Sequence, residues 1–302
     1  MINDEYHIPV LLHAAVDGLV KNSNGIYVDV TFGGGGHSRE ILSRLKNGKL
    51  IGFDQDLDAR QNVIQDDRFV FVAQNFEYLK NNLKLLKQIP VDGLIADLGV
   101  SSFQFNTPNR GFSYRFDARL DMRMNAHSNL DAEKVINQYD EAGLLRVFRD
   151  YGELRESKKI ARKICERRQK KKIQTINELL EVVSGLVQKN KINQFQSKIF
   201  QAIRIEVNEE MDVLKKLLEQ GREVIKPGGR FVVITYHSLE DRLVKNFFRS
   251  GNFNGELQKD FYGNVLKPFE EINRKPIIPD ETELEANNRA RSAKLRIAER
   301  KK

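Results

Sequence analysis

Three acidic residues and a run of glycines have the types and spacing that could do chemistry. Asp29, Asp54 and Asp97 each lie at or near the end of an apolar run, and residues 33–36 are all glycine. Glycine permits a turn with positive φ and lets a ligand lie directly against the backbone. Asp54 follows Gly33 by 21 positions, a spacing at which a strand-end carboxylate can accept hydrogen bonds from ribose hydroxyls. The pattern therefore predicts a site for a ligand that contains a nucleoside.

The elements that must hold these residues alternate between apolar runs and amphipathic segments, which is typical of an α/β fold. Because parallel strands end at one edge of a sheet, Gly33, Asp54 and Asp97 would meet in a single crevice. We therefore expect a doubly wound, mostly parallel, Rossmann-like sheet. A late strand that could run antiparallel is expected at the sheet edge. Strands are predicted at residues 26–30, 49–54, 69–73, 91–97, 230–236 and 292–299, and helices at 10–19, 57–64, 77–87, 213–225 and 238–248, the last capped by Ser238.

The glycine turn by itself leaves two kinds of ligand open. A dinucleotide fingerprint requires Gly-x-Gly-x-x-Gly, and Ser38 stands where its third glycine should be. The segment Asp29-x-Thr31-x-Gly33-x-Gly35 is similar instead to the Asp-x-Gly-x-Gly-x-Gly corner of methyltransferases that use S-adenosylmethionine (SAM), with Thr31 in place of the first glycine. In that class the acid lies near the charged amino-acid part of the ligand. Asp29 could equally serve only to cap the loop.

The net charge of +8 is concentrated in two zones. Residues 144–172 contain 12 Lys/Arg against 4 Asp/Glu, and residues 286–302 contain 7 against 1, so the remainder of the chain is net acidic. Two concentrated basic zones beside a nucleoside-type pocket indicate a polyanionic partner, most simply nucleic acid. The alternative is that each zone is only a solvated helix face.

Composition excludes several classes of protein. The single cysteine, Cys165, is incompatible with a disulfide framework or a Cys-rich zinc site. The N-terminus lacks the basic region and apolar stretch of a signal peptide, and no apolar run reaches the roughly 20 residues of a membrane helix. We expect a soluble, cytoplasmic protein with no membrane partner.

The regular α/β rhythm stops after residue 104. Residues 106–129 are polar and contain Pro108 and Gly111, which indicates a long loop, and long ordered loops are usually functional. Residues 131–208 show helical apolar spacing without strand runs. They predict an inserted helical domain whose basic face is the first positive zone.

A collinear series of motifs spans nearly the whole chain. It includes segments that begin at His7, Thr31, Asp97, Arg110, Leu120, Phe200, Tyr236 and Arg289, namely HIPVLL, TFGGGGHS, DLGVSS, RGFSY, LDMRM, FQAIRIEVN, YHSLEDR and RARS. In these segments the chain resembles the bacterial 16S ribosomal RNA (cytosine-N4)-methyltransferase family, called RsmH or MraW. It departs from the family at Gly34, where a basic residue is commoner, at Phe103, where proline is usual, and in the run before Asn208-Glu209.

The resemblance implies both the architecture and the reaction. It implies a methyltransferase domain in two parts, residues 1–108 and 209–302, around an inserted helical substrate-recognition domain with its entry loop, residues 109–208. The implied reaction moves a methyl group from SAM to the exocyclic N4 of one cytidine in the decoding region of 16S ribosomal RNA, within the small ribosomal subunit or a late assembly particle. The oligomeric state is left open, with a homodimer among the options. SAM contacts are implied at Gly35, Gly36, His37, Asp54, Phe76, Asp97 and Gln104, to which the glycine-turn argument adds Gly33.

The chemistry calls for an acceptor beside the amine. A cytosine amine is a poor nucleophile because its lone pair is delocalised into the ring, and an acceptor for one of its hydrogens would let the nitrogen pyramidalise. Placement of the nitrogen near 3 Å from the donor carbon contributes further. Asp97, or a backbone carbonyl of residues 100–102, is the hypothesised acceptor; a purely cofactor-binding Asp97 is the alternative. No metal is required, since the sulfonium is already a strong electrophile.

RNA contacts are expected from cations interleaved with aromatics. Such a composition suits stacking on an extruded base and gripping its phosphates. The alternative is a structured loop that packs on its own domain. The predicted RNA-binding residues are Arg110, Tyr114, Arg115, Arg119, Arg204, His237, Arg289 and Arg291.

Two other functions compete with methyl transfer. An NAD-dependent oxidoreductase is disfavoured by Ser38 and by the lack of a hydride-transfer constellation. An RNA-binding assembly factor on a methyltransferase scaffold would keep the basic zones but would not need the set of Asp54, Asp97 and Gln104.

Overall fold

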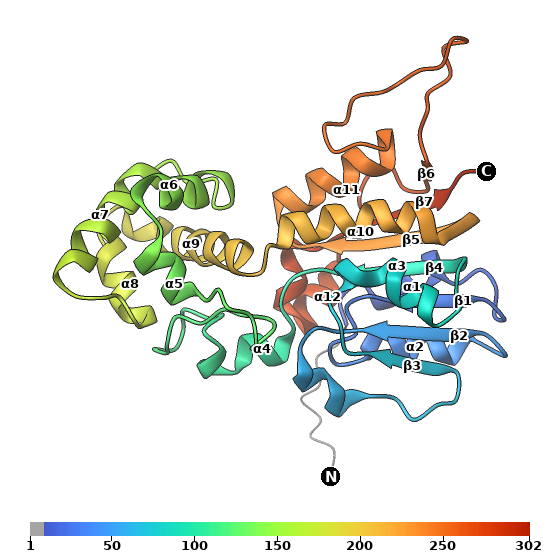
Figure 1. The fold of residues 1–302 in the computed structure, drawn as a ribbon, viewed down its shortest axis with the longest axis horizontal. Coiled ribbons are helices and arrows are strands. Elements are labelled where there is room, and N and C mark those ends of the chain that lie inside the picture. Colours follow the sequence, from blue (N-terminus) through green and yellow to red (C-terminus); the bar gives the residue numbers. More distant parts are fainter. Residues whose placement is uncertain (1–8) are drawn as a thin grey trace. The chain divides into compact units, whose positions relative to one another are not determined.

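The chain forms two compact units. The computed structural model describes residues 9–302, so the motif that begins at His7 lies partly outside the described residues. The first unit combines the chain up to Gly99 with Met211–Lys302, and the second is Val100–Glu210 (Figure 1). The sequence placed these limits at 108/109 and 208/209. Residues 100–108 belong with the helical unit because Val100 and Phe105 pack against its core.

The first unit is built on a sheet with the strand order β3-β2-β1-β4-β5-β7-β6. The strands β1 to β5 run parallel, and β7 is antiparallel to both of its neighbours. This order confirms the predicted Rossmann-like class. The strands are added toward one edge of the sheet from β1 to β3 and toward the other edge from β4 onward. The strands are β1 (Ile26–Asp29), β2 (Lys49–Phe53), β3 (Phe69–Val72), β4 (Val91–Asp97), β5 (Ile225–Thr235), β6 (Phe269–Glu271) and β7 (Lys294–Arg300).

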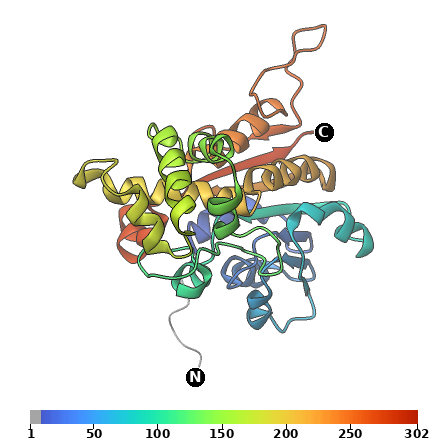
Figure 2. The ribbon, with the colours of Figure 1, turned by 60° about the vertical axis from the view of Figure 1, so that its left-hand side comes forward.

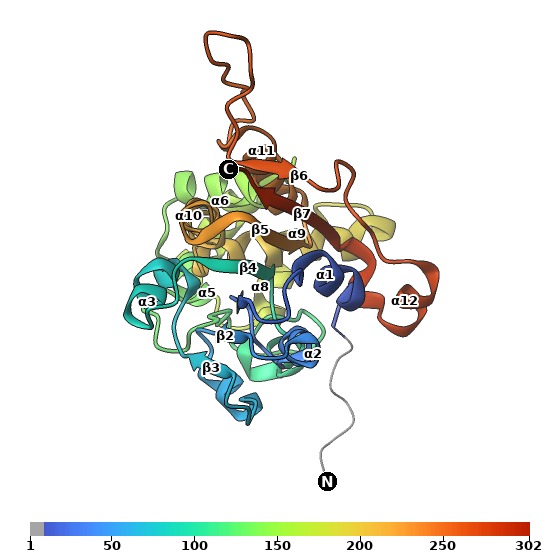
Figure 3. The ribbon, with the colours of Figure 1, turned by 90° about the vertical axis from the view of Figure 1, so that its right-hand side faces the viewer.

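Helices cover both faces of this sheet because strand side chains alternate between the two faces. Val28 and Val30 pack in a core with α3, α10 and α11, whereas Tyr27 packs in a second core with α1 and α2. Figure 3 looks roughly along the strands, with α3 and α10 on one side of the sheet and α1 and α2 on the other. The helices of this unit are α1 (Leu12–Leu19), α2 (Gly36–Arg44), α3 (Leu79–Leu85), α10 (Glu210–Val224), α11 (Ser238–Ser250) and α12 (Glu281–Ala286).

Several predicted elements differ in detail. The last strand, β7, is not at the edge of the sheet, because β6 pairs on its outer side. The sequence did not predict β6, because three residues are too few to show an alternation of apolar and polar side chains. The helix expected at 57–64 is the 3-10 helix η1 (Leu57–Asn62). Residues 226–229 form a bulge inside β5: the register against β4 shifts between Val91↔Ile225 and Gly93↔Arg230, and Gly228 has φ 79°.

The second unit is helical, as expected (Figure 2, green to yellow). Several of its helices begin at side-chain caps, such as Asp131, Asp140 and the capping box of Thr175 with Glu178. The long loop before α5 packs into this core rather than lying free: Leu120 and Met122 are fully buried. Its helices are α4 (Ser102–Asn106), α5 (Ala132–Gln138), α6 (Glu141–Asp150), α7 (Ser157–Lys170), α8 (Ile176–Val183) and α9 (Ile192–Val207).

None of the helices within residues 9–302 combines the length and the apolar character needed to cross a bilayer.

Candidate active site

The glycine turn connects β1 to α2. Gly35 caps α2 in the left-handed region, with φ 76°, and a Cβ on Gly36 would overlap the ring of Pro9. The Asp29 carboxylate stabilises the turn from below by accepting hydrogen bonds from Thr31 N at 3.1 Å and Ser38 Oγ at 2.7 Å. Asp29 therefore caps the loop. Ser38, which stands where a dinucleotide fingerprint has its third glycine, donates its hydroxyl to this Asp29 carboxylate.

Asp54 connects the end of β2 to the same turn. Its Oδ2 accepts a 2.7 Å hydrogen bond from Gly33 N, and its Oδ1 accepts one of 2.8 Å from Asp56 N. Burial raises the pKa of this carboxyl to about 6. The cap of the following 3-10 helix is Asp56, which accepts from Asp58 N, so Asp54 is not used as a helix cap. Each oxygen of Asp54 accepts one of these bonds and keeps further acceptor capacity.

Asp97 ends β4, one strand over from β1. Its backbone N–H donates to Thr31 Oγ1 at 2.7 Å, and its Oδ1 accepts a 2.7 Å hydrogen bond from the Tyr236 hydroxyl. Its Oδ2 lies 3.8 Å from His37 Nδ1, and the side chain is 25% exposed. Burial raises the pKa of Asp97 to about 6, against the lowering effect of His37 and of the Tyr236 hydrogen bond.

His37 is placed between a carbonyl and this carboxylate. Its Nε2 lies 3.1 Å from Val10 O, and because a carbonyl only accepts, Nε2 carries a proton. Its Nδ1 faces Asp97, and the ring is buried. The 3.8 Å between Nδ1 and the Asp97 carboxylate is longer than a hydrogen bond, and the predicted role of His37 as a cofactor contact stays a prediction.

Tyr236 was not singled out as a functional residue from the sequence. The signal that could have found it is its position at the end of a predicted strand, where side chains reach the crevice. Burial and the neighbouring Asp97 raise the pKa of Tyr236 well above its ordinary value. The phenol therefore stays protonated and donates to Asp97 across the physiological pH range.

His237 begins α11, and Ser238 does not cap it as predicted. The His237 side chain accepts from Glu240 N at 3.4 Å, while Glu240 Oε2 accepts from Tyr236 N at 2.8 Å and from His237 N at 3.3 Å. This bond to Nδ1 leaves the proton of a neutral imidazole on Nε2. That nitrogen is buried, lies 3.2 Å from Glu240 Oε1, and makes no well-directed hydrogen bond within residues 9–302.

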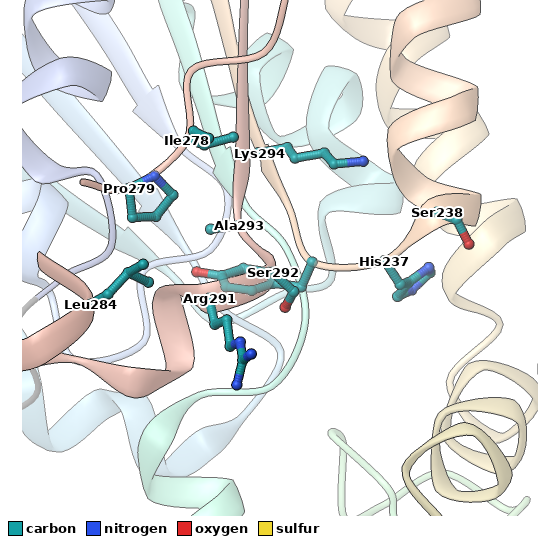
Figure 4. Close-up of a pocket in the computed structure, with 10 residues that line it drawn as sticks. His237, Ser238, Ile278, Pro279, Leu284, Arg291, Ser292, Ala293 and Lys294 are labelled. Carbon is teal, nitrogen blue, oxygen red and sulfur yellow. The ribbon is translucent and has the colours of Figure 1, made fainter. Parts of the chain in front are cut away.

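A pocket of about 360 Å³ opens beside Tyr236 and His237. Figure 4 shows apolar side chains on one side of it and His237 on the other, with cationic side chains between them. Arg291 is exposed, whereas Lys294 lies 3.3 Å from a carboxylate oxygen of Asp241. One wall of the pocket is apolar and is formed by Ile278, Pro279 and Leu284. The polar wall is formed by His237, Arg291 and Lys294.

Three of the arginines predicted to bind RNA are engaged by other groups of the helical unit. Arg119 pairs with Asp131 at 2.7 Å and Glu133 at 2.9 Å, and Arg204 makes two hydrogen bonds to Glu210, at 2.8 and 2.9 Å. Both guanidinium groups are therefore engaged within the unit. The Arg110 guanidinium likewise donates to the carbonyls of residues 123 and 124.

Other predicted residues are held in different ways. Tyr114 packs edge-on against Phe200 and lies 3.1 Å from Ser197 Oγ. Arg115 is exposed, next in the chain to Phe116, which is 45% exposed and is not among the predicted RNA-binding residues. Arg289 is half-buried near the start of η5 (Asn288–Ser292) in the first unit.

The two remaining residues predicted to contact SAM lie in the first turns of short helices. Phe76 begins the 3-10 helix η2 (Phe76–Tyr78) and packs against the sheet core. Gln104 belongs to the helical unit, where its Oε1 accepts from Ser101 N at 3.1 Å in a capping box. Their contacts with SAM stay predictions.

Most cations of α7, within the first basic zone, face solvent. Ile160, Ala161 and Ile164 of α7 point into the helical core, which places the cations on the opposite side of the helix. Arg162 is paired with Glu166 at 2.7 Å. The exposed cations of this helix are Lys158, Lys159, Arg162, Lys163 and Lys170.

Comparison with known proteins identifies the family. The profile of the MraW methylase family matches residues 4–301. "Ribosomal RNA small subunit methyltransferase H" of Flavobacterium johnsoniae is 57% identical over 297 residues, 98% of each chain. The protein of the same name from Christiangramia forsetii is 54% identical over 299 residues, 99% of each chain, and that of Bacteroides thetaiotaomicron is 53% identical over 297 residues, 98% of each. The resemblance inferred from the motifs is confirmed, and the chain belongs to the MraW methylase family.

Proposed function

We propose that this protein transfers the methyl group of SAM to the exocyclic N4 of a cytidine in the decoding region of 16S ribosomal RNA. The family makes methyl transfer the class of reaction, and relatives over the full length are named for small-subunit ribosomal RNA. The observation that carries the proposal is the oriented carboxylate of Asp97 at the end of β4, beside the glycine turn.

The residues of the turn fit SAM. Gly35 and Gly36 leave a backbone surface without side chains, and Asp54 keeps acceptor capacity for the ribose hydroxyls. When bound, SAM supplies an electrophilic methyl group on a sulfonium. The residues Gly33, Gly35, Gly36, His37, Asp54 and Phe76 are proposed to hold it.

Asp97 is proposed to hold the amine. Oδ1 is fixed by Tyr236, which leaves Oδ2, facing His37, to accept one N4–H of the cytosine. That hydrogen bond lets the nitrogen direct its lone pair toward the methyl donor. The amine must lose a proton as it is methylated, and Oδ2 is the acceptor at hand. A backbone carbonyl of residues 100–102 is the alternative acceptor.

RNA is proposed to approach through the cations that the fold leaves exposed. In the first unit this is Arg291, at the pocket of Figure 4 that His237 also lines. In the helical unit these are Arg115 and the outer face of α7. Phosphate contacts by such cations release counterions, so affinity for RNA falls as salt rises.

The test is methyl transfer from labelled SAM to small subunits purified from cells that lack this protein, followed by mass mapping of the ribosomal RNA. We expect one methyl group on N4 of one cytidine, and loss of transfer in Asp97→Asn with retained SAM binding by calorimetry. Transfer to another base or to a ring atom would overturn the proposal. Binding of subunits without any transfer would instead support an assembly factor. Deproteinised 16S RNA as a second substrate distinguishes naked RNA from the particle.

A further inference from the structure

A hairpin connects α11 to β6 (Figure 1, orange). Two aromatic side chains at its tip are almost fully exposed. Phe261 is 97% exposed and Tyr262 is 86% exposed. Their ring centroids lie 5.6 Å apart with planes at 87°, so the pair presents two differently oriented ring faces. Aromatic side chains usually bury a large area, and two that stay outside at one tip require an explanation.

The tip is rigid. The carboxylate of Asp260 accepts from Tyr262 N and Asn264 N at 2.9 Å and from the Asn264 side chain at 3.0 Å. Backbone bonds close the loop, from Asp260 N to Asn264 O at 2.9 Å and from Gly263 N to Asp260 O at 3.0 Å. Gly263 supplies the left-handed residue, with φ 84°. The turn therefore holds the two rings outward and lowers the conformational entropy that a partner would have to remove.

The stem is anchored on the sheet unit. Phe253 stacks on Phe247 of α11, with centroids 5.3 Å apart and planes at 22°, and Asn246 donates to Phe253 O at 2.8 Å. The hairpin follows the C-terminal end of α11, whereas His237 caps the N-terminal end of this 13-residue helix. At 1.5 Å per residue this is about 20 Å away, so a contact at the tip is separate from the methyl-transfer site.

The chemistry of the tip favours nucleobases over phosphates. Residues 256–267 contain two acids, Glu256 and Asp260, and two lysines, Lys259 and Lys267, so the hairpin offers no net attraction to polyanions. Lys267 is also paired with Glu270 at 2.8 Å. Leu257 and Leu266 of the stem are also exposed, at 42% and 54%, but the turn at the tip presents the two rings. Unpaired bases of RNA stack on such rings with little sequence preference.

We propose that Phe261 and Tyr262 form a second docking element, which stacks on unpaired bases of small-subunit ribosomal RNA. This inference rests on the proposed function for the identity of the RNA. The tip contributes binding energy without salt dependence, whereas the basic surfaces contribute energy that salt removes. The element acts on substrate binding and leaves the chemical step unchanged.

The direct test uses fluorescence, because the chain contains no tryptophan. Phe261→Trp places a single tryptophan at the tip, and the variant is titrated with small subunits from cells lacking the protein and with deproteinised 16S RNA. We expect quenching in both titrations, since stacking on a base quenches indole emission. A matched control is Leu85→Trp on α3, at a residue that is 81% exposed, which should stay unquenched. A blue shift without quenching would indicate a protein partner, and no change would indicate no contact; either result overturns the proposal.

Kinetics provide the second test. In Phe261→Ala/Tyr262→Ala we expect the KM for small subunits to rise about tenfold with kcat unchanged, by the same factor at 50 and 200 mM salt. Phe261→Leu/Tyr262→Leu keeps apolar side chains but removes the rings, and should show the same loss, whereas Tyr262→Phe should not. Recovery of KM by the leucine variant would replace stacking with an apolar protein contact. Because the fluorescence titration needs no turnover, a protein that binds without methylating would refute the proposed reaction and leave the docking element standing.

Discussion

The Tyr236 hydroxyl donates a 2.7 Å hydrogen bond to Oδ1 of Asp97, although the two residues lie 139 positions apart in the chain. They meet because β4 and β5 are parallel neighbours, with Asp97 opposite Ile234, so both residues lie at the same edge of the sheet. The bond fixes one oxygen of the carboxylate and leaves the other free for a substrate. It makes Tyr236 a positioning residue for the proposed acceptor.

Replacing Tyr236 by Phe should slow methyl transfer and shift its pH dependence. The hydrogen bond lowers the pKa of Asp97, so its loss raises that pKa and moves the acid limb of the rate profile to higher pH. A hydrogen bond to a charged group contributes about 1.5–3 kcal/mol, which corresponds to a fall in kcat of about tenfold or more. Single-turnover rates between pH 5 and 9 measure both effects. An unchanged profile with normal SAM affinity would show that Tyr236 does not act on Asp97.

The wild-type rate should itself fall as the pH drops through about 6, because Asp97 must be ionised to accept the amine hydrogen and its pKa is about 6. Asp54 has a pKa of about 6 as well, so SAM binding needs a separate measurement over the same range. The rate at saturating SAM reports Asp97, and the affinity for SAM reports Asp54. A rate at saturating SAM that stays flat down to pH 5 would contradict an ionised Asp97 in catalysis.

Asp97→Asn should stabilise the protein while abolishing transfer. The folded pKa of Asp97 is raised from 3.8 to about 6, so the folded state binds more protons than the unfolded state between these values, and stability falls as pH rises through that window. Above pH 6 the ionised carboxylate costs up to about 3 kcal/mol. Asparagine removes this cost. Urea unfolding should show a gain that is about 1 kcal/mol larger at pH 8 than at pH 5; equal gains would contradict the raised pKa.

The sequence predicted the strands and the acids at their ends well, because buried parallel strands are continuous apolar runs that stop where the crevice begins. Its position at a strand end marks Tyr236 as a crevice residue, but its partner could not be predicted, since the bond to Asp97 joins distant segments. It also could not separate Arg204 and Arg119 from Arg115 and Arg291: all are arginines near aromatic or basic residues, but the first two pair with carboxylates of the fold. The exposed rings of Phe261 and Tyr262 read as ordinary loop residues until the hairpin is seen.

Arg204 should prove to be structural. Its side chain is 17% exposed and that of Glu210 is 9% exposed, and removal of the arginine leaves a buried, charged carboxylate without its cationic partner. We expect Arg204→Ala to lower the free energy of unfolding by about 3–5 kcal/mol. A companion variant, Arg204→Met/Glu210→Leu, should recover much of this loss. Urea unfolding of both variants measures the effect, and a fully stable Arg204→Ala with weakened RNA binding would restore Arg204 as an RNA contact.

Arg291 should show the opposite behaviour. Its side chain is exposed at the pocket beside His237 and has no carboxylate partner within residues 9–302. Arg291→Ala should leave stability within about 0.5 kcal/mol but weaken binding to small subunits. Because a phosphate contact releases about one counterion, the slope of log affinity against log salt should become shallower by roughly one. Arg291→Lys keeps the charge and should restore that slope. If Arg291→Ala binds subunits with the wild-type slope, the pocket does not hold a phosphate and the RNA must enter elsewhere.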